Sequence, residues 1–378
     1  MRRAAKSRAP LGVRTRPRPR QRVYREYWLF AARRHEIYEQ RLAGAPAPWT
    51  DDEILQRYRF CNVFRASDRV SQYLIRDVLY EPEGLDARDR FLRTVLFRLF
   101  SKPSTWELIE QHCGTLTADG FDTKRVGRVL DHAMAGGQTL YTSAFILCAN
   151  RAYGHARKHR NHLALVTAML KDRLPERVLA ARSLEQVYVA LHSYPLIGPF
   201  MAYQIAIDLN YGPDLRFSED AFTVPGPGAL RGLTKVFLSL GDYSPAEAIH
   251  WLVEQQHIVQ EKLGIQAPRL RGRRHLHAID CQNLLCELDK YARVKFPKLR
   301  SDRVRIKQTF APAGDLPDQF FPPDWGLQVC DRCPQREASR SGSSRARTAR
   351  SSLTPTSKNA PPATTRSSPG SRSAALAT

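Results

Sequence analysis

Apolar residues recur at helical spacing through most of the chain between residues 26 and 310. In residues 26–43, for example, Leu29, Ile37 and Leu42 fall near one face of a helix, and Thr50 with Glu53 forms a capping-box pattern that starts the next helix. The strict alternation typical of strands is nearly absent. Further helices are predicted near residues 68–80, 88–101, 104–113, 123–135, 158–173, 183–193, 199–210, 245–264 and 277–296. Numerous helices with short connections indicate an all-α domain.

Charge is distributed unevenly along the 378-residue chain. The net charge is +22, but residues 1–25 carry ten basic and no acidic residues, and residues 334–378 carry eight basic residues and one acid, which leaves only +5 for residues 26–333. Both ends lack the apolar residues needed to offset ordering entropy. We therefore expect a disordered basic arm (1–25), an all-α domain (26–310), an extended linker (311–333) and a disordered Ser/Arg/Pro-rich tail (334–378). Such arms commonly bind nucleic-acid phosphates, although a solubilising tail or a coding bias towards Arg explains them equally well.

Neither a membrane span nor a secretion signal is predicted. No run of 18 apolar residues occurs, and Met1 is followed by an Arg-rich polar stretch instead of an apolar segment. Seven Cys in a chain of this length do not suggest a disulfide-stapled scaffold. We expect a cytoplasmic protein associated with the nucleoid, or a nuclear one in a eukaryote.

Residues 183–212 predict a helix-hairpin-helix. One helix ends at Tyr194, a Pro-Leu-Ile-Gly turn follows, and Pro199 takes the first position of a second helix that runs to about Asn210. The backbone N–H groups at the start of that helix suit a DNA phosphate, and Gly198 permits a close approach. Gly198 and Pro199 are therefore predicted DNA contacts, with ordinary helix packing as the alternative.

The residues after the hairpin resemble helix-hairpin-helix DNA glycosylases, which carry a catalytic Asp about twenty residues beyond the last Gly of the turn. Glu219 and Asp220 follow Gly198 by 21 and 22 positions. The resemblance implies catalytic roles for both, with Asp220 the stronger candidate. Alternatively, these acids simply cap a helix.

Three positions depart from the glycosylase pattern. Leu196 replaces the first Gly of the turn, and Ala221 stands where these enzymes have a His. Phe200 occupies the position of the lyase-type Lys. A Schiff-base mechanism is therefore not predicted, whereas a mechanism that uses a carboxylate remains open.

Four sequence blocks, taken in order, resemble the helical, glycosylase-related domain associated with 5-hydroxymethyl-deoxyuridine DNA kinases and the alpha-glutamyl/putrescinyl-thymine pyrophosphorylase group. The blocks are residues 62–75 (NVFRASDRVSQYLI), 194–211 (YPLIGPFMAYQIAIDLNY), 218–237 (SEDAFTVPGPGALRGLTKVF) and 278–310, which includes AIDCQNLLCELDKYARVKFP and RVRIKQTF. The resemblance spans residues 25–310 and implies a role in thymine hypermodification in DNA, where a hydroxymethyl group is activated by phosphorylation and then displaced by an amine. No GxxxxGK[ST] stretch occurs, so no kinase activity is predicted, and a separate kinase is a candidate partner.

Further candidate residues surround these blocks. Basic residues expected to contact phosphate are Arg65, Arg69, Arg231, Lys235, Arg303, Arg305 and Lys307. Residues expected to form a base or substrate pocket are Asp280, Gln282, Asn283, Glu287 and Lys290, most of which share one stripe of the helix at 277–296. Ion pairs, solvated charge and an ordinary polar helix face are the alternatives.

No metal site and no cofactor are predicted. His155, His159 and His162 share a helix face, but no fitting carboxylate or Cys accompanies them in the sequence. Cys281 and Cys286 lie on different faces of one helix, and the CxxC pair at 330–333 is remote in sequence. A shared four-Cys cluster is therefore not expected.

The sequence thus predicts an all-α, helix-hairpin-helix DNA glycosylase-like protein with disordered basic termini, which binds duplex DNA carrying a modified pyrimidine. The expected mechanism flips the base and uses Asp220 as general base or electrostatic stabiliser for an amine transfer. Base excision is a second hypothesis. A non-catalytic module that brings a partner kinase to DNA is a third.

Overall fold

The computed structural model describes residues 14–142 and 151–299, and residues 301–327 except 304, 307, 312, 313 and 315. Helices dominate this part of the chain, which confirms the all-α prediction. Their bounds are α1 Gln21–Leu42, α2 Glu53–Arg57, α3 Arg69–Tyr73, α4 Ala87–Phe100, α5 Pro103–Cys113, α6 Thr123–Ala135, α7 Lys158–Lys171, α8 Leu174–Leu179, α9 Leu184–His192, α10 Pro199–Asn210, α11 Pro227–Val236, α12 Pro245–Leu263 and α13 Ala278–Lys295. Short 3-10 segments are η1 (Arg65–Ser67) and η3 (Pro323–Trp325), and α3 continues as a π-helix, η2 (Leu74–Tyr80). None of the described helices is long and apolar enough to cross a membrane.

Local signals explain most helix starts. A capping box of Ser244 and Glu247 begins α12, and Pro occupies the first turn of α10 and α11. The predicted cap at Thr50 is wrong. Asp52 caps α2 instead, because its carboxylate accepts the backbone N–H groups of Ile54 and Leu55.

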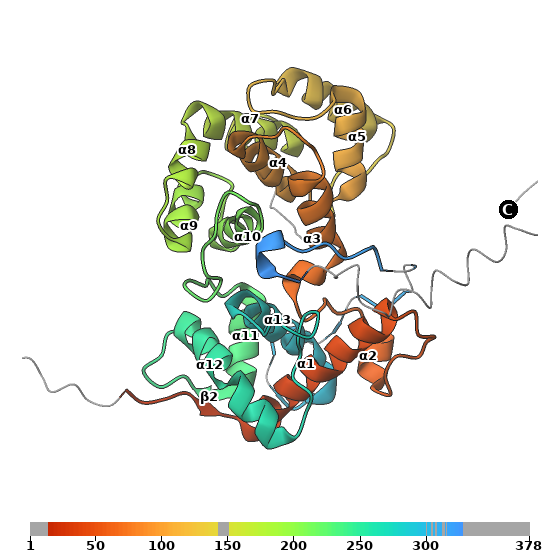
Figure 1. Ribbon diagram of the computed structural model, residues 1–378, viewed down its shortest axis with the longest axis vertical. Helices are drawn as coiled ribbons and strands as arrows, with labels where there is room; N and C mark the ends of the chain where they lie inside the picture. Colours follow the sequence, from red (N-terminus) through yellow and green to blue (C-terminus); the bar gives the residue numbers. More distant parts are fainter. Residues whose placement is uncertain are drawn as a thin grey trace, which may run out of the picture. The chain divides into compact units, whose positions relative to one another are not determined.

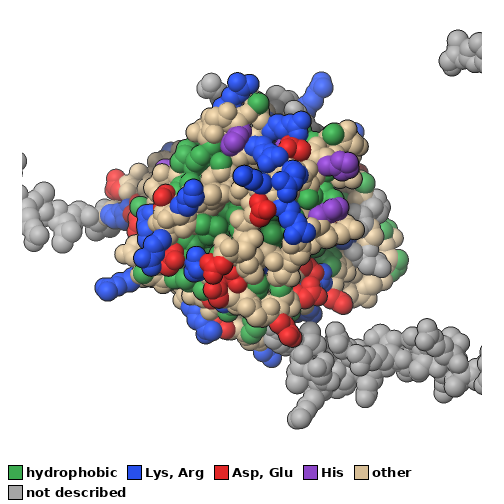
Figure 2. All heavy atoms as spheres, turned by 90° about the horizontal axis from the view of Figure 1, so that it is seen from above, with side chains coloured by type: hydrophobic (Ala, Val, Ile, Leu, Met, Phe, Trp, Pro, Cys, Tyr) green, Lys and Arg blue, Asp and Glu red, His purple; other side chains and the backbone are tan. Residues whose placement is uncertain are grey.

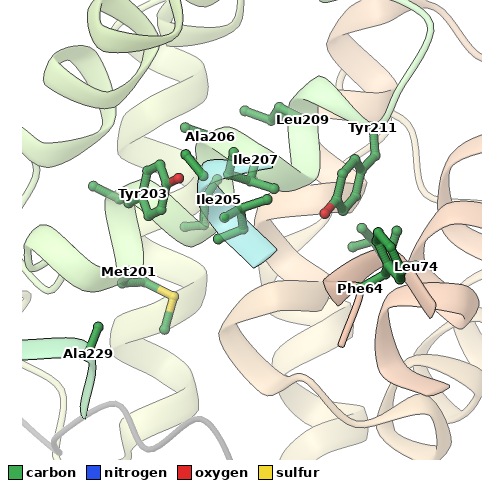
Figure 3. Packing of buried hydrophobic residues seen from close by; sticks show 14 of the residues in the cluster. Phe64, Leu74, Met201, Tyr203, Ile205, Ala206, Ile207, Leu209, Tyr211 and Ala229 are labelled. Carbon is green, nitrogen blue, oxygen red and sulfur yellow. The ribbon is translucent and has the colours of Figure 1, made fainter. Parts of the chain in front are cut away.

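The helices form two groups that are discontinuous in sequence. Figure 1 shows α4 to α10 in one group, and α1, α2, α11, α12 and α13 in the other. Helix α10 is buried along almost its whole length, and its side chains lie in the same packed cluster as Phe64, Leu74 and Tyr211 (Figure 3). In the second group α11 packs closely on α13, because a Cβ at Gly232 would lie 2.2 Å from the backbone oxygen of Leu285.

Most of residues 18–25 form regular structure, although they were expected to belong to a disordered basic arm. Helix α1 begins at Gln21, five residues before the predicted start at 26. Before it, β1 (Arg18–Pro19) pairs antiparallel with β2 (Phe237–Ser239). The apolar side chains of Val23 and Tyr24 are buried, which explains why the helix extends into this basic stretch. Residues 1–13 lie outside the described part.

Part of the expected linker packs against the helices. Phe321 and Leu327 are buried, and the Trp325 ring meets the Tyr211 ring edge-on at 5.5 Å between centroids. Aromatic residues in this segment bury apolar surface, which a solvated linker does not do. The predicted tail at 334–378 lies outside the described residues.

Candidate functional site

The predicted hairpin has its two helices where the sequence places them. Helix α9 ends at His192, and α10 begins at Pro199. Leu196 in the turn adopts a left-handed backbone conformation, with φ of +73°, which Gly adopts most readily. The turn therefore keeps a glycine-type geometry despite the larger side chain. Gly198 and Pro199 are exposed, and a Cβ built on Gly198 would meet nothing within 4 Å.

The loop that carries Glu219 and Asp220 is held against this hairpin. Phe222 packs against Tyr188 of α9 and Tyr203 of α10, at ring-centroid distances of 5.1 and 6.1 Å. Asn210 closes the same loop, because its side chain bonds both the N–H and the C=O of Phe217 at 2.9 Å. The hairpin and the carboxylates thus lie next to each other through direct packing.

Asp220 meets the N-terminus of α13. Its Oδ1 accepts the backbone N–H of Ala278 at 2.8 Å, and its Oδ2 lies 2.7 Å from Nδ1 of His277. Burial alone raises the pKa of Asp220, but the hydrogen bond and charge of His277 and the Ala278 amide hold the pKa below its ordinary value. The carboxylate is therefore ionised at neutral pH, and its side chain remains 30% exposed.

His277 was not among the site residues predicted from the sequence. Ala221 follows Asp220 in the sequence, and the fold supplies an imidazole to this carboxylate from 57 positions downstream. His275 lies beside it, with 4.6 Å between the ring centroids. The His-Leu-His sequence directly before a helix was the available signal, but spacing alone did not connect it to Asp220.

Glu219 has a different environment from its neighbour. It is buried, and its carboxylate pairs with Arg274 at 2.6 Å. The Arg274 guanidinium in turn stacks over Trp325 at 3.6 Å from the ring centroid. Since burial and this pair occupy Glu219, Asp220 is the more exposed of the two acids.

A buried network supports the site from behind. Asp280 accepts the backbone N–H of His277 at 3.1 Å and that of Arg65 at 2.9 Å, and burial raises its pKa to about 6. Arg65 continues inward to Asp208, at 2.7 Å, and Arg98 reaches the same carboxylate at 2.9 Å. Arg65 is thus an internal ion-pair partner and not a surface phosphate contact, because the fold buries it beneath α10.

The polar stripe of α13 faces other parts of the protein more than an open pocket. Gln282 accepts the Gly226 N–H at 3.2 Å, and Asn283 donates to the Asn62 C=O at 3.3 Å. Glu287 accepts the Cys61 N–H at 3.0 Å and pairs with Lys290 at 2.5 Å, and Lys290 also donates to the Arg59 C=O at 3.4 Å. These predicted pocket residues satisfy the backbone of residues 59–62 and the start of α11.

Arg231 and Lys235 surround a buried acid. Lys235 is only 3% exposed and lies 2.8 Å from Asp289, which Arg231 and Arg293 also contact at 3.1 and 2.5 Å. Burial opposes ionisation of Asp289, but hydrogen bonds from Lys235 and Arg293 lower its pKa. The structure therefore assigns Lys235 to charge compensation inside the fold, which differs from the predicted phosphate contact.

The remaining predicted phosphate contacts lie nearer the surface. Arg69 is half-buried and donates to the Gly314 C=O at 3.0 Å. Arg303 and Arg305 are exposed after α13, and Lys307 lies outside the described residues, as do Cys330 and Cys333. His159 and His162 are buried on α7, whereas His155 precedes this helix and is exposed, so the three do not share a helix face as predicted.

A basic groove that the sequence did not predict lies between α6 and α7. It has a volume of about 400 Å³ and is lined by Lys124, His155, Arg160 and Lys171, among others. Figure 2 shows Lys and Arg side chains gathered on the face over α4 to α7, with His side chains beside them. Arg160 in this groove pairs with Asp131, so Lys124 and Lys171 are the exposed basic side chains that line it.

Comparisons with known proteins confirm the family over the first three sequence blocks and over the fourth as far as residue 301. A family model described as the helical domain of 5-hmdU DNA kinase matches residues 21–301. The 5-hmdU DNA kinase of Bacillus phage SP10 is 26% identical over 294 residues, which cover 73% of this chain and 46% of the relative. The chain therefore spans about half the length of this curated relative. No solved structure matches the chain.

Proposed function

The chain belongs to the family of the 5-hmdU DNA kinase helical domain, and from this premise we propose that it binds DNA and acts on an activated 5-hydroxymethyl pyrimidine in thymine hypermodification. One observation carries the proposal. Phe222 packs against Tyr188 and Tyr203 of the two hairpin helices, which holds the loop of Asp220 against the hairpin whose turn exposes Gly198. In this proposal the turn binds the phosphate of a nucleotide, and the flipped base of the same nucleotide reaches the Asp220 carboxylate.

The starts of three helices, α10, α11 and α13, lie near the loop of Asp220. Asp220 contacts the start of α13 at Ala278, and Gly226 at the start of α11 bonds Gln282 of α13. A Cβ on Gly226 would lie 2.7 Å from Phe200, in the first turn of α10. Because each helix start carries partial positive charge, their convergence favours the phosphate and pyrophosphate groups that the reaction requires.

The proposed reaction is the displacement of pyrophosphate by an amine. The amine nitrogen forms a bond to the exocyclic methylene carbon, the bond from that carbon to the pyrophosphate oxygen breaks, and pyrophosphate leaves with the electron pair. The proton lost by the amine passes to Asp220 or to solvent. Since the pKa of Asp220 is lowered, the carboxylate is a weak base, and its main effect is to stabilise positive charge on the attacking nitrogen. Kinase activity is not part of the proposal, because no P-loop motif occurs in these 378 residues.

The transfer reaction is tested with duplex DNA that carries pyrophosphorylated 5-hydroxymethyluracil. The protein, the DNA and a panel of amines are incubated, and the DNA is digested to nucleosides for mass spectrometry. We expect a new aminomethyl nucleoside and a rate that falls by about 10²- to 10⁴-fold in Asp220→Asn. Asp119→Asn, at an exposed acid far from the hairpin in sequence, is the matched control and retains the rate. Unchanged nucleosides with every amine contradict the proposal.

DNA binding is tested separately through its salt dependence. We propose that the groove between α6 and α7 gives the DNA backbone a second contact, because Lys124 and Lys171 line it and are exposed. Replacing both by Ala reduces the slope of log affinity against log salt by about two, whereas replacing the exposed Lys262 leaves the slope unchanged. If the parent protein, the double variant and the Lys262 variant have equal slopes, the groove is not part of the DNA interface.

A non-catalytic DNA-binding role is the second candidate. Both oxygens of Asp220 are engaged at the start of α13, which is also what a purely structural cap requires. In that case Asp220→Asn leaves every cellular DNA modification intact. Formation of abasic sites in the same assay instead identifies the base-excision alternative.

A further inference from the structure

Asp220, His275 and His277 form a three-residue cluster of a kind that binds metals. One potential ligand atom from each lies within 4.8 Å of the other two, and all three residues are half-buried. Two imidazoles and one carboxylate are ligands that Zn²⁺ and neighbouring transition metals prefer, and three protein ligands leave coordination positions open for water or substrate. We infer that this cluster binds one divalent transition-metal ion.

The hydrogen bonds around the cluster leave lone pairs for a metal. Each oxygen of Asp220 accepts one hydrogen bond and keeps a second lone pair. His277 uses Nδ1 towards Asp220, which leaves its Nε2 for a metal. Within the described part of the chain, His275 makes ring contacts with His257 and His277 but no hydrogen bond. Two unpaired imidazole nitrogens beside a carboxylate are thus accessible to a cation.

Backbone contacts also hold two of the ligands in place. The Ala278 N–H orients Asp220 through Oδ1, and Asp280 accepts the backbone N–H of His277. Such supporting bonds restrict the orientation of metal ligands and strengthen binding. The partial positive charge at the start of α13 opposes a cation, but the Asp220 carboxylate outweighs it, because a full charge at bonding distance exceeds a half charge farther away.

The role of the ion rests on the proposed function, whereas metal binding itself does not. An ion here lies beside the position proposed for the flipped base, so its open positions would hold phosphate oxygens of the activated substituent. Asp220 is then a ligand and not a proton acceptor. Metal dependence of transfer therefore separates the two roles of this carboxylate.

The test uses the full chain, stripped with a chelator and titrated with Zn²⁺ by calorimetry. Cys330→Ser and Cys333→Ser are combined in the background protein, so that the CxxC pair does not contribute a competing site. We expect one ion per chain, and affinity reduced by at least about tenfold in His275→Ala and in Asp220→Asn. His257→Ala is the matched control, because His257 contacts His275 but lies outside the cluster, and it retains the affinity.

Several outcomes decide the matter. Absence of binding, or equal affinity in the background protein and His275→Ala, overturns the site. His275→Gln keeps the polarity and approximate size of the side chain, and serves if His275→Ala fails to fold by circular dichroism. Transfer activity without metal binding refutes the ion but keeps the proposed function. Stoichiometric binding that depends on His275, without transfer on any DNA, supports the ion and contradicts the function.

Discussion

Asp208 and Asp220 lie twelve residues apart and both contact basic side chains, but their surroundings differ. Asp208 is completely buried on α10 between Arg65 and Arg98, two cations that do not titrate near neutral pH. Asp220 is partly exposed and contacts a histidine and a helix start. The first arrangement ties α4, η1 and α10 together. The second leaves the carboxylate partly exposed, with an imidazole and a backbone N–H as its partners.

Asp289 has surroundings similar to those of Asp208. It too is fully buried, and Arg231, Lys235 and Arg293 surround it. Both acids are surrounded by permanent positive charge and have no access to a ligand. The comparison teaches that a carboxylate near basic residues is a candidate for ligand contact only where its burial is incomplete.

The largest effect is expected for Asp208→Ala. Without the carboxylate, Arg65 and Arg98 become buried charges without compensation, and the free energy of unfolding falls by about 3–5 kcal/mol. Urea denaturation followed by circular dichroism measures the change, with Asp119→Asn at an 84% exposed side chain as a control near zero. A loss below about 1 kcal/mol means that the two clusters do not differ in the way proposed.

The second-largest loss of stability is expected for Lys235→Met. The substitution keeps the aliphatic length but leaves Asp289 with Arg231 and Arg293 only, so the free energy of unfolding falls by about 1–3 kcal/mol. Lys124→Met, at an exposed position of α6, serves as the matched control for stability. The salt dependence of DNA binding is expected to remain unchanged in Lys235→Met, because this ammonium is buried. A reduced slope with normal stability places Lys235 at the DNA instead.

Asp220→Asn tests the other side of the comparison. The amide oxygen of Asn still accepts the Ala278 N–H, so we expect stability to change by less than about 1 kcal/mol even though activity falls. Thermal unfolding and the transfer assay are measured on the same preparation. A loss of stability as large as that of Asp208→Ala makes Asp220 a structural residue.

The smallest effect concerns an exposed acid. Hydrogen bonds from Ser244 and from Arg14 lower the pKa of Glu247 from 4.5 to about 2 in the folded protein. Because the folded pKa lies below the unfolded one, the stabilisation is present above about pH 4.5 and is lost as the pH falls towards 2. Glu247→Gln therefore lowers the melting temperature slightly at pH 7, and the difference from the parent protein shrinks on acidification. Glu254→Gln on the same helix is the control, and a difference that is independent of pH refutes the ionic contribution.

Prediction from sequence worked best where neighbouring residues decide the structure. Pro199 starts α10 as expected, and Ser244 with Glu247 starts α12, because a helix start depends on residues within a few positions of it. The left-handed turn persists even though Leu196 replaces Gly. Prediction was weaker for charged residues. Arg65 and Lys235 have the spacing of surface phosphate contacts, but burial made them internal partners of Asp208 and Asp289.

The sequence by itself determined that this protein is helical and that two helices with a short turn precede a pair of acids, and its blocks between residues 62 and 301 indicated the family. Only the tertiary structure decided which acid is closed and which is open. Glu219 pairs with Arg274, and Asp220 contacts His277, although the partners are 55 and 57 residues apart in the sequence. The physical reason is that helix formation depends on local backbone and side-chain preferences, whereas ion-pair partners and burial depend on how distant segments pack.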